Sequence, residues 1–263
     1  MFKTLSLLLL AMIPLLAGQA LAEENAETTY RVGISAEPYP PFYSRDASGE
    51  WHGWEIDFTH ELCARLDAQC EIVPLAWEGI IPALNIGKID MIIGSMSATP
   101  ARAKQIAFSD KYYDTPTGLV ALDSTDIEPT PEGVSGAIIG VQSGSIQQDY
   151  AYVHFGGTAG AIRVYQTLDE ELQDLVAGRL DGVLGDTLAM QPFIHSDEGQ
   201  RCCEYRGNVA ADPAILGAGV AVGLRQSDTD LLARVNEAIA AIRSDGTYQK
   251  ISERYFDIDI YGE

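Results

Sequence analysis

Two side chains of opposite charge stand beside predicted strand ends and together could bind a small zwitterion. Arg102 lies in the first turn of a short helix that Thr99 caps and Pro100 opens, and this turn brings the side chain back toward the preceding loop. Its guanidinium is a planar fork that matches the two oxygens of a carboxylate. Asp186 follows the predicted strand at 182–184. Its carboxylate could pair with the ammonium group of a ligand, or could cap the helix predicted after it.

The loop before Arg102 carries two further polar side chains. Ser95 and Ser97 could present hydroxyls and backbone groups to the carboxylate and the ammonium of the same ligand. Serines in an isolated loop would indicate little, but these stand directly before Thr99 and Arg102. We therefore include Ser95, Met96 and Ser97 in the candidate ligand-binding site.

The sequence lacks the patterns of several kinds of catalytic site. It has no Ser/His/Asp order of a hydrolase, no metal-ligand spacing and no phosphate-binding glycine loop. The four histidines fall in predicted surface loops and helices, away from the strand ends. We therefore predict no catalytic residues, no bound metal and no cofactor.

The chain is strongly acidic, with a formal net charge of −21 over 263 residues. A polyanion repels the phosphate backbone of nucleic acids, so we expect no nucleic-acid partner. The excess of carboxylates could help to gather cationic solutes, or could reflect a salty habitat that selects acidic surfaces. Composition alone leaves both interpretations open.

Predicted strands alternate with predicted helices, which is typical of an α/β fold with mostly parallel sheets. The pattern runs twice, with a break near 114–116, and therefore predicts two α/β lobes. Ligands of such sheets bind at the carboxyl ends of strands. The loops at those ends are 36–42, 76–78, 94–102, 142–147 and 185–187. The predicted strands are 30–35, 71–75, 89–93, 119–122, 138–141, 162–165, 182–184 and 216–224, and the longer predicted helices are 55–66, 77–86, 168–177, 187–193, 229–243 and 248–255.

The N-terminus has the pattern of a secretory signal peptide. One positive charge at Lys3 precedes an apolar run at 5–16, and small residues stand at Ala20 and Ala22. A transmembrane anchor is the alternative, but the run is shorter than the ~20 apolar residues that span a bilayer. We predict that residues 1–22 are removed and that the mature protein is exported.

Export permits disulfides, and four cysteines are present. Cys63 and Cys70 stand at the end of a predicted helix and near the start of the next strand, so a bridge would join the two elements. Cys202 and Cys203 are adjacent, and a ring between neighbours is rare. We expect these two to be free thiols, or one of them to pair with another chain.

A series of short motifs, in order from about residue 30 to the C-terminus, resembles the bacterial extracellular solute-binding proteins of family 3. The motifs are most similar to those of the lysine/arginine/ornithine-, histidine- and opine-binding members. Each motif alone is weak, but their order and spacing together are specific. They are YPPF at 39–42, GWEIDF at 53–58, ELC at 61–63 with Cys70, WEGIIPAL at 77–84, KIDMII at 88–93, SMSATPAR at 95–102, FSDKYY at 108–113, IGVQSGS at 139–145, AGRLD at 177–181, SDGTYQK at 244–250 and YFDID at 255–259.

The resemblance implies the fold of a type II periplasmic binding protein, with two α/β lobes joined by a two-strand hinge and the ligand in the cleft. Lobe 1 would comprise 27–114 and 217–263, and lobe 2 would comprise 117–211, with hinges at about 114–117 and 211–217. The lobes would close on the ligand by hinge motion. The protein would be a periplasmic monomer that delivers an amino acid to the membrane permease of an ABC transporter.

The resemblance also assigns roles to residues of the cleft. Arg102 would bind the carboxylate of the ligand and Asp186 its ammonium, while Ser145 and Ile146 of lobe 2 would offer backbone N–H groups. Ile146 replaces a threonine of many relatives, which removes a hydroxyl but not the N–H. Gly94 replaces a serine of some relatives and leaves more room at that wall.

Tyr39 and Trp77 match two aromatic positions that enclose the side chain of the ligand. Such faces attract guanidinium and imidazole groups by ~1–2 kcal/mol, although Trp77 is also compatible with a place in the core. Relatives carry an acid in the loop before Tyr39, and Glu37 is the candidate here, although the loop is one residue longer and a solvated glutamate fits equally. The expected ligand is a basic or opine-like amino acid, with histidine or other polar amino acids second.

Two other classes of protein fit part of this pattern. One is a periplasmic enzyme on the same fold, similar to cyclohexadienyl dehydratase, which would need a cleft acid or base beyond the two partners of the ligand's charges. The other is the sensor domain of a receptor, which would need a membrane anchor and a signalling domain. We predict a binding protein and not an enzyme.

Overall fold

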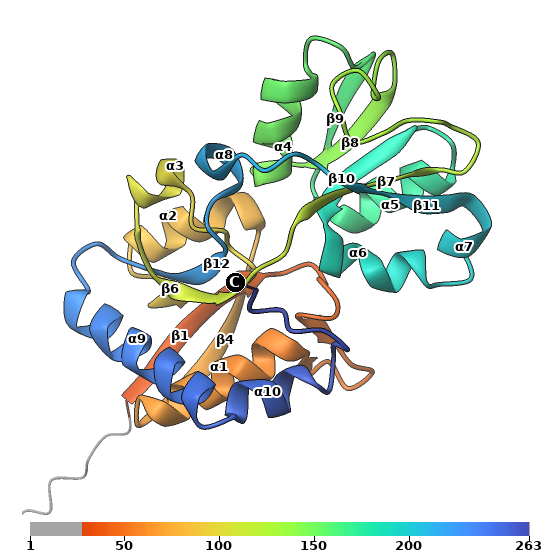
Figure 1. The fold of residues 1–263 in the computed structure, drawn as a ribbon. Coiled ribbons are helices and arrows are strands. Elements are labelled where there is room, and N and C mark those ends of the chain that lie inside the picture. The colour runs from red at the N-terminus through yellow and green to blue at the C-terminus, as the bar shows by residue number, and fades with distance from the viewer. Residues whose placement is uncertain (1–27, 263) are drawn as a thin grey trace, which may run out of the picture.

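The computed structural model describes residues 28–262 and shows two α/β lobes, each built on a five-stranded sheet (Figure 1). The chain passes from the first lobe to the second and back. Its two end segments therefore belong to one lobe, and the middle of the chain forms the other. The signal peptide predicted at 1–22 lies outside the described residues.

The sheet of lobe 1 has the strand order β4-β1-β5-β12-β6. β1 pairs in parallel with β4 and β5, whereas β12 runs antiparallel to β5 and β6. The late strand β12 thus lies between two strands from the first half of the chain. The strands are β1 (Thr28–Ser35), β4 (Ala68–Leu75), β5 (Met91–Ile92), β6 (Ala107–Tyr113) and β12 (Val220–Leu224), and β2 (Ser44–Arg45) pairs separately with β3 (Trp51–His52).

Helices of lobe 1 bury their apolar faces against this sheet. On α1 the buried side chains of Trp54, Phe58 and Leu62 recur every four residues, as an amphipathic helix requires, and join one hydrophobic cluster with the sheet. Burying each such side chain contributes about 1.5–3 kcal/mol. The helices are α1 (Trp54–Arg65), the 3-10 turn η1 (Trp77–Gly79), α2 (Ile80–Asn85), α3 (Pro100–Ala103), α9 (Thr229–Ser244) and α10 (Thr247–Ser252).

A glycine positions the start of α1. Gly53 has a φ of +129°, and a Cβ atom there would lie 2.3 Å from the carbonyl oxygen of Phe42. This close approach lets the N–H groups of Trp54 and Glu55 donate to the carbonyls of Pro41 and Phe42. The first turn of α1 is thereby held against the loop that follows β1.

The sheet of lobe 2 has the strand order β11-β7-β10-β8-β9. β8 is parallel to β9 and β10, and β7 is antiparallel to β10 and β11. Leu119 and Leu184 face one hydrophobic cluster, while Val120 and Val183 face another, because successive side chains of a strand point to opposite faces. The elements are β7 (Thr117–Leu122), β8 (Ile138–Gln142), α4 (Ile146–Tyr150), the π-helical turn η2 (Ala151–Phe155), β9 (Ala161–Tyr165), α5 (Leu168–Val176), β10 (Gly182–Asp186), α6 (Thr187–Ile194), α7 (Gly199–Cys202) and β11 (Cys203–Asn208).

Two segments connect the lobes. The first is short, because β6 ends at Tyr113 and β7 begins at Thr117. The second runs from the end of β11 to the start of β12 and contains α8 (Pro213–Leu216). Figure 1 shows α8 between α3 of lobe 1 and α4 of lobe 2.

Hydrogen bonds join the second connection to both lobes. On the lobe 1 side, the N–H of Ala218 donates to the carbonyl of Ala98, and the N–H of Ala98 donates to the carbonyl of Gly219. On the lobe 2 side, the ring of His154 lies 2.9 Å from the carboxylate of Asp212, which also caps α8. The second connection is therefore bonded at both ends.

Two strands of the five-stranded sheets, β6 and β11, are absent from the sequence prediction. Both lie at the edge of a sheet and pair antiparallel with a single neighbour. Half-exposed edge strands carry polar residues, so they lack the continuous apolar run that marks a buried strand. Each sheet thus contains more antiparallel pairing than the sequence indicated.

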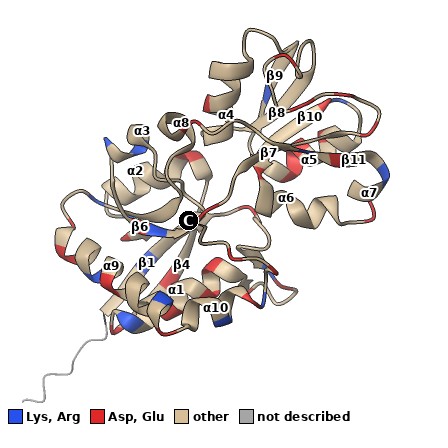
Figure 2. Cartoon of the chain, in the orientation of Figure 1, with Lys and Arg blue, Asp and Glu red and all other residues tan. Residues whose placement is uncertain are grey.

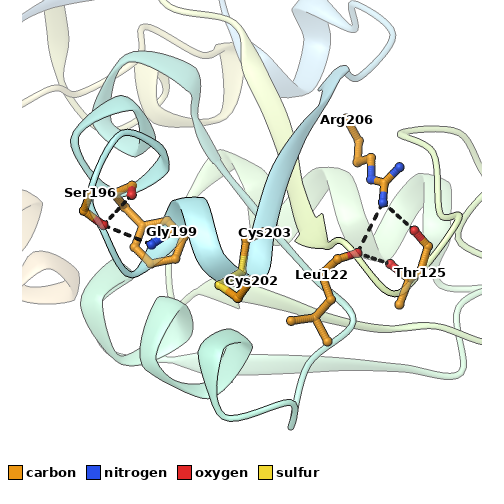
Figure 3. The surroundings of a disulfide bond; sticks show 8 residues. Leu122, Thr125, Ser196, Gly199, Cys202, Cys203 and Arg206 are labelled. Carbon is orange, nitrogen blue, oxygen red and sulfur yellow. Dashed lines mark hydrogen bonds between the residues drawn. A yellow bond between two sulfur atoms is a disulfide. The ribbon is translucent and has the colours of Figure 1, made fainter.

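Each lobe carries one disulfide. Cys63 of α1 and Cys70 of β4 form the predicted bridge, with Cα atoms 6.0 Å apart. The expectation for Cys202 and Cys203 is wrong, because these neighbours are bonded to each other (Figure 3). α7 ends at Cys202 and β11 begins at Cys203, and this change from helix to strand lets the two sulfur atoms meet. The described part of the chain contains no free cysteine.

Candidate functional site

A cavity lies between the lobes, at the carboxyl ends of strands from both sheets. Its walls are residues at the ends of β1, β4, β5, β8, β9 and β10 or in the loops that follow them, and all of these loops except the one after β9 were predicted. Both lobes therefore contribute to one site. The lining residues are Ser35, Glu37, Pro38, Tyr39, Tyr43, Trp77, Gly94, Ser95, Ser97, Arg102, Gln142, Ser145, Ile146, Gln147, Thr167, Leu168 and Asp186.

Nine of the ten predicted binding residues line this cavity, and Met96 does not. The side chain of Met96 is 1% exposed and packs with Ile80, Leu84 and other apolar residues of lobe 1. Because Ser95 and Ser97 face the cavity, the side chain between them is turned into the lobe. Met96 is thus a core residue of lobe 1.

Arg102 belongs to lobe 1 and reaches across to lobe 2. Thr99 caps α3 by accepting a hydrogen bond from the N–H of Arg102. The guanidinium donates to the carbonyl of Ser97 over 3.1 Å and to the carbonyl of Gly144 in lobe 2 over 3.2 Å. Burial lowers the pKa of Arg102 to about 10, and nearby carboxylates oppose this shift. The side chain therefore stays cationic at neutral pH and keeps further N–H groups for a bound anion.

Asp186 stands at the N-cap of α6, but its side chain makes no capping hydrogen bond. Its carboxylate instead accepts hydrogen bonds from the hydroxyl of Tyr39 and the amide of Gln147, each over 2.7 Å. Asp186 is 6% exposed, and burial raises its pKa to about 6 against the effect of these two bonds and of Arg102. This geometry favours the site role over the capping role.

Aromatic side chains form part of the lobe 1 wall. Tyr39 and Trp77 are both half-buried, and the guanidinium of Arg102 lies 5.4 Å from the centre of the Trp77 ring. Trp77 also packs against a hydrophobic cluster of lobe 1, so the site and core interpretations both hold in part. Glu37 lines the cavity as well, but it is exposed to solvent.

Direct hydrogen bonds join the lobes at two places. The carbonyl of Gly144, in the loop after β8, accepts from two side chains of lobe 1, and the neighbouring Ser143 donates to Glu78. At the second place, Tyr39 of lobe 1 donates to Asp186 of lobe 2. The lobes are thus in contact with each other around the cavity.

Ser95 has a left-handed backbone, with a φ of +57°, which costs a residue with a side chain about 1–2 kcal/mol. Its N–H and its hydroxyl donate to the carboxylate of Glu55 over 2.7 and 2.9 Å, and the hydroxyl of Tyr112 donates to the same carboxylate. Glu55 is fully buried, and burial raises its pKa to about 7, although these hydrogen bonds oppose the shift. Sequence reasoning did not single out Glu55.

Ser145 and Ile146 begin the first helix of lobe 2. The hydroxyl of Ser145 caps α4 by accepting from the N–H of Gln148, and it donates to the carbonyl of Gln142. That hydroxyl is therefore engaged within lobe 2. Ile146 is 7% exposed and contributes an apolar side chain to the wall.

Sequence reasoning missed four residues of the lobe 2 wall, namely Gln142, Gln147, Thr167 and Leu168. Gln147 is 6% exposed and donates to both Asp186 and Thr117, so it fixes the orientation of the Asp186 carboxylate. Thr167 and Leu168 follow β9. The rule that ligands bind at strand ends also applies to the loop after β9, so that loop could have been included.

The charges of the cavity suit binding of a zwitterion. Acidic residues are spread along both lobes (Figure 2), whereas the cavity places one guanidinium and one buried carboxylate together. Within residues 28–262, no group of three or more His, Cys, Asp or Glu side chains could hold a metal ion. No helix of the described chain is long and apolar enough to cross a membrane.

Known proteins resemble this chain over nearly its whole length. The lysine/arginine/ornithine-binding periplasmic protein of Escherichia coli (strain K12) is 35% identical over 258 residues, which cover 98% of this chain and 99% of that protein. The structure of an ancestral arginine-binding protein bound to arginine has a TM-score of 0.79 and 29% identity, and covers 88% of this chain and 99% of its own. An ancestral amino acid-binding protein, a precursor of cyclohexadienyl dehydratase, has a TM-score of 0.75 and 29% identity over 87% and 95% of the two chains.

These structural neighbours confirm the predicted fold class, that of the type II periplasmic binding proteins with two α/β lobes. The family model of the bacterial extracellular solute-binding proteins, family 3, matches residues 30–258. That range includes both sheets, apart from the first two residues of β1, and every loop that lines the cavity. The chain therefore belongs to the bacterial extracellular solute-binding proteins of family 3.

Proposed function

We propose that this chain is the substrate-binding component of an ABC importer and that it binds an amino acid between its lobes. The observation that carries the proposal is the pair of opposite charges, Arg102 and Asp186, in one cavity. An amino acid bears a carboxylate and an ammonium on one carbon, and both need partners once water is excluded. Membership of the family and the ligands named for its relatives support the same function.

Within this class, the ligand is a basic or opine-like amino acid. Tyr39 and Trp77 offer aromatic faces to a cationic or planar side chain, and Glu37 is the acid available for a distal positive charge. The Escherichia coli relative is named for lysine, arginine and ornithine, which supports a basic ligand. Histidine and other polar amino acids are the second choice.

The lobes open and close around the ligand. Lobe 1, at 27–114 and 217–263, moves against lobe 2, at 117–211, about hinges near 114–117 and 211–217. The hydrogen bonds of Gly144 and of Tyr39 join the lobes across the cavity, and this motion would break them when the lobes separate to release a ligand. The mature protein, without residues 1–22, acts as a periplasmic monomer and presents the closed form to the membrane permease.

The chain is a binding protein and not an enzyme. One observation favours the alternative, a dehydratase acting on a cyclohexadienyl acid, because a precursor of such an enzyme is a structural neighbour and the raised pKa of Asp186 would suit proton transfer. Asp186 is, however, already engaged by Tyr39 and Gln147. Incubation of the mature protein with a cyclohexadienyl acid should give no product. Turnover that Asp186→Asn abolishes would establish the enzyme instead.

A thermal-shift screen tests the proposed function. Purified mature protein, stripped of bound ligand, is heated with each L-amino acid, with opines and with unrelated sugars. A compound that binds only the folded state at a hundredfold excess over its dissociation constant stabilises that state by ~2.7 kcal/mol. We expect a clear rise in melting temperature with arginine, lysine, ornithine or an opine, and none with sugars.

Two variants make the screen specific. Arg102→Ala should abolish the shift because the carboxylate of the ligand loses its partner. Arg179→Ala is the matched control, since Arg179 is 62% exposed and pairs with Asp174 away from the cavity. If no compound with an α-amino and an α-carboxylate group shifts the folded wild type, the proposed function is wrong.

A further inference from the structure

Glu55 lies directly behind Ser95, which lines the cavity. Its Oε1 atom accepts from the N–H of Ser95 and from the hydroxyl of Tyr112, and its Oε2 atom accepts from the hydroxyl of Ser95. All three partners are donors. This arrangement suits an ionised carboxylate, which only accepts hydrogen bonds. A protonated carboxyl group would add its own hydrogen to two oxygen atoms that already accept three hydrogen bonds.

The hydrogen bonds to Glu55 decide what Ser95 can offer to a ligand. A serine hydroxyl has one hydrogen, and that of Ser95 is directed at Glu55, as is its backbone N–H. Ser95 therefore presents only oxygen lone pairs to the cavity. Lone pairs attract an ammonium and repel a carboxylate, so Ser95 acts with Asp186 and not with Arg102.

We propose that ionised Glu55 is a positioning residue for the ammonium half of the site: it holds Ser95 in its left-handed conformation and orients its hydroxyl so that only acceptors face the ligand. This inference rests on the proposed function and adds to it a dependence of ligand binding on pH. Recognition of the ammonium of an amino acid then depends on the ionisation of Glu55.

The groups around Glu55 indicate the direction of the pH dependence. The titratable groups that act on it are the phenols of Tyr112, Tyr113 and Tyr43 and the carboxyl of Asp186 in lobe 2. Two carboxylates oppose each other's ionisation, and an ammonium placed near them relieves both. Affinity for an amino acid should therefore fall as the pH falls through about 7 for Glu55 and about 6 for Asp186.

Isothermal titration calorimetry at pH 6, 7 and 8 tests the proposal, with L-arginine, L-lysine, L-histidine and L-glutamine as probes. A group with a pKa near 7 is about 90% ionised at pH 8 and about 10% at pH 6, so the wild type should bind its best probe about tenfold more weakly at pH 6 from this group alone. Glu55→Gln should bind at least fivefold more weakly at pH 8 and lose that tenfold dependence. It should keep only the smaller dependence due to Asp186.

Three controls identify the cause. Glu171→Gln replaces the other fully buried glutamate, which does not line the cavity, and should leave the pH profile unchanged. The deaminated analogue of L-arginine, 5-guanidinopentanoic acid, should show no Glu55-dependent profile because it lacks the ammonium. In a Ser95→Gly background, Glu55→Gln should change affinity by less than about twofold, because glycine adopts the left-handed conformation freely and has no hydroxyl to reorient.

The possible outcomes are distinct. If none of the probes binds the wild type at pH 8, the proposed function and this inference both fail. If a probe binds but Glu55→Gln keeps the wild-type pH profile, only this inference is overturned. An undiminished effect of Glu55→Gln in the Ser95→Gly background would also overturn it, since Glu55 would then act by its charge and not by positioning Ser95.

Discussion

Glu55 in lobe 1 and Glu171 in lobe 2 are both fully buried, yet their surroundings are opposite. The carboxylate of Glu55 accepts three hydrogen bonds, whereas neither oxygen of Glu171 has a hydrogen-bond partner among residues 28–262. Burial raises the pKa of Glu171 well above its usual range, and the neighbouring Glu170 adds to the shift. One buried acid is thus part of a polar network beside the cavity, and the other is a buried carboxyl group on α5 without hydrogen-bond partners among the described residues.

The disulfides of the two lobes also differ, in how far apart in the sequence the joined residues lie. The bridge of lobe 1 joins α1 to β4, seven residues apart in sequence, while the bridge of lobe 2 links two neighbours. A cross-link restricts the unfolded chain more when it closes a longer loop. In both comparisons the lobe 1 feature joins residues that are further apart in the sequence, so its removal should have the larger effect on stability.

The largest expected effect is that of Glu55→Ala. Removing the carboxylate leaves two hydroxyls and one N–H without an acceptor in a buried place, at about 1–3 kcal/mol each. The free energy of unfolding, from urea denaturation at pH 7, should fall by about 3–5 kcal/mol, the lower part of that sum, because Ser95 lines the cavity and water can reach its hydroxyl. A loss below about 1 kcal/mol would mean that water replaces the carboxylate and that the network is not needed for the fold.

The pH dependence of stability sharpens the same comparison. The pKa of Glu55 rises from 4.5 to about 7 on folding, so between these values the folded state holds more protons than the unfolded state. Stability due to Glu55 is therefore highest below pH 4.5 and falls as the pH rises to about 7, by about 1.4 kcal/mol per pH unit. Relative to the wild type, Glu55→Gln should gain stability as the pH rises from 5 to 7, which urea denaturation at each pH measures. A difference that is constant with pH would show that Glu55 does not titrate in this range.

The lobe 1 disulfide should have the next largest effect. The double variant Cys63→Ala with Cys70→Ala frees α1 from β4 in the unfolded and folded states alike, and should lower the free energy of unfolding by about 2 kcal/mol. Calorimetric melting under non-reducing conditions measures the change. Affinity for the ligand should stay within about twofold, because neither cysteine lines the cavity.

Replacing Glu171 should stabilise the protein. An apolar side chain of similar volume, as in Glu171→Met, removes a buried carboxyl group that lacks partners, and should raise the free energy of unfolding by about 1–2 kcal/mol. Urea denaturation measures this gain, with Gln173→Met on the exposed side of α5 as the control. Destabilisation by Glu171→Met would contradict the view that this acid is isolated.

The smallest effect should come from the lobe 2 disulfide. Cys202→Ala with Cys203→Ala removes a ring that constrains almost no unfolded chain, so the free energy of unfolding should fall by about 1 kcal/mol or less. Cys203 is 6% exposed in a hydrophobic cluster, and alanine keeps that position apolar. A loss as large as that for the lobe 1 bridge would reverse the comparison between the lobes.

Local patterns predicted the parts of the site that stand at strand ends. Arg102 and Asp186 follow short signals, a capped helical turn and a buried strand, and both line the cavity. Met96 was included because it stands between Ser95 and Ser97, but its side chain is turned into the lobe and is 1% exposed. The direction in which a loop side chain points depends on the three-dimensional path of the loop, which the order of residue types does not specify.

Long-range contacts explain what sequence reasoning missed. Glu55 was assigned to a helix start, but its partner Ser95 lies forty residues away, and only the packing of the first turn of α1 against the loop after β5 brings the two together. Glu171 stands three residues after Leu168 and four before Leu175, so helical spacing did place it on the buried face of α5. A charged side chain usually stays exposed to solvent, but the packing of α5 on its sheet buries this one.

The second connection between the lobes, which contains α8, is hydrogen-bonded to the loop that positions Arg102. Ala98, which exchanges hydrogen bonds with the chain just after α8, lies between Ser97 and Thr99, the two residues that hold Arg102. The backbone that links the lobes is therefore bonded directly to the residue between these two, so the same short loop both anchors the connection and positions the guanidinium.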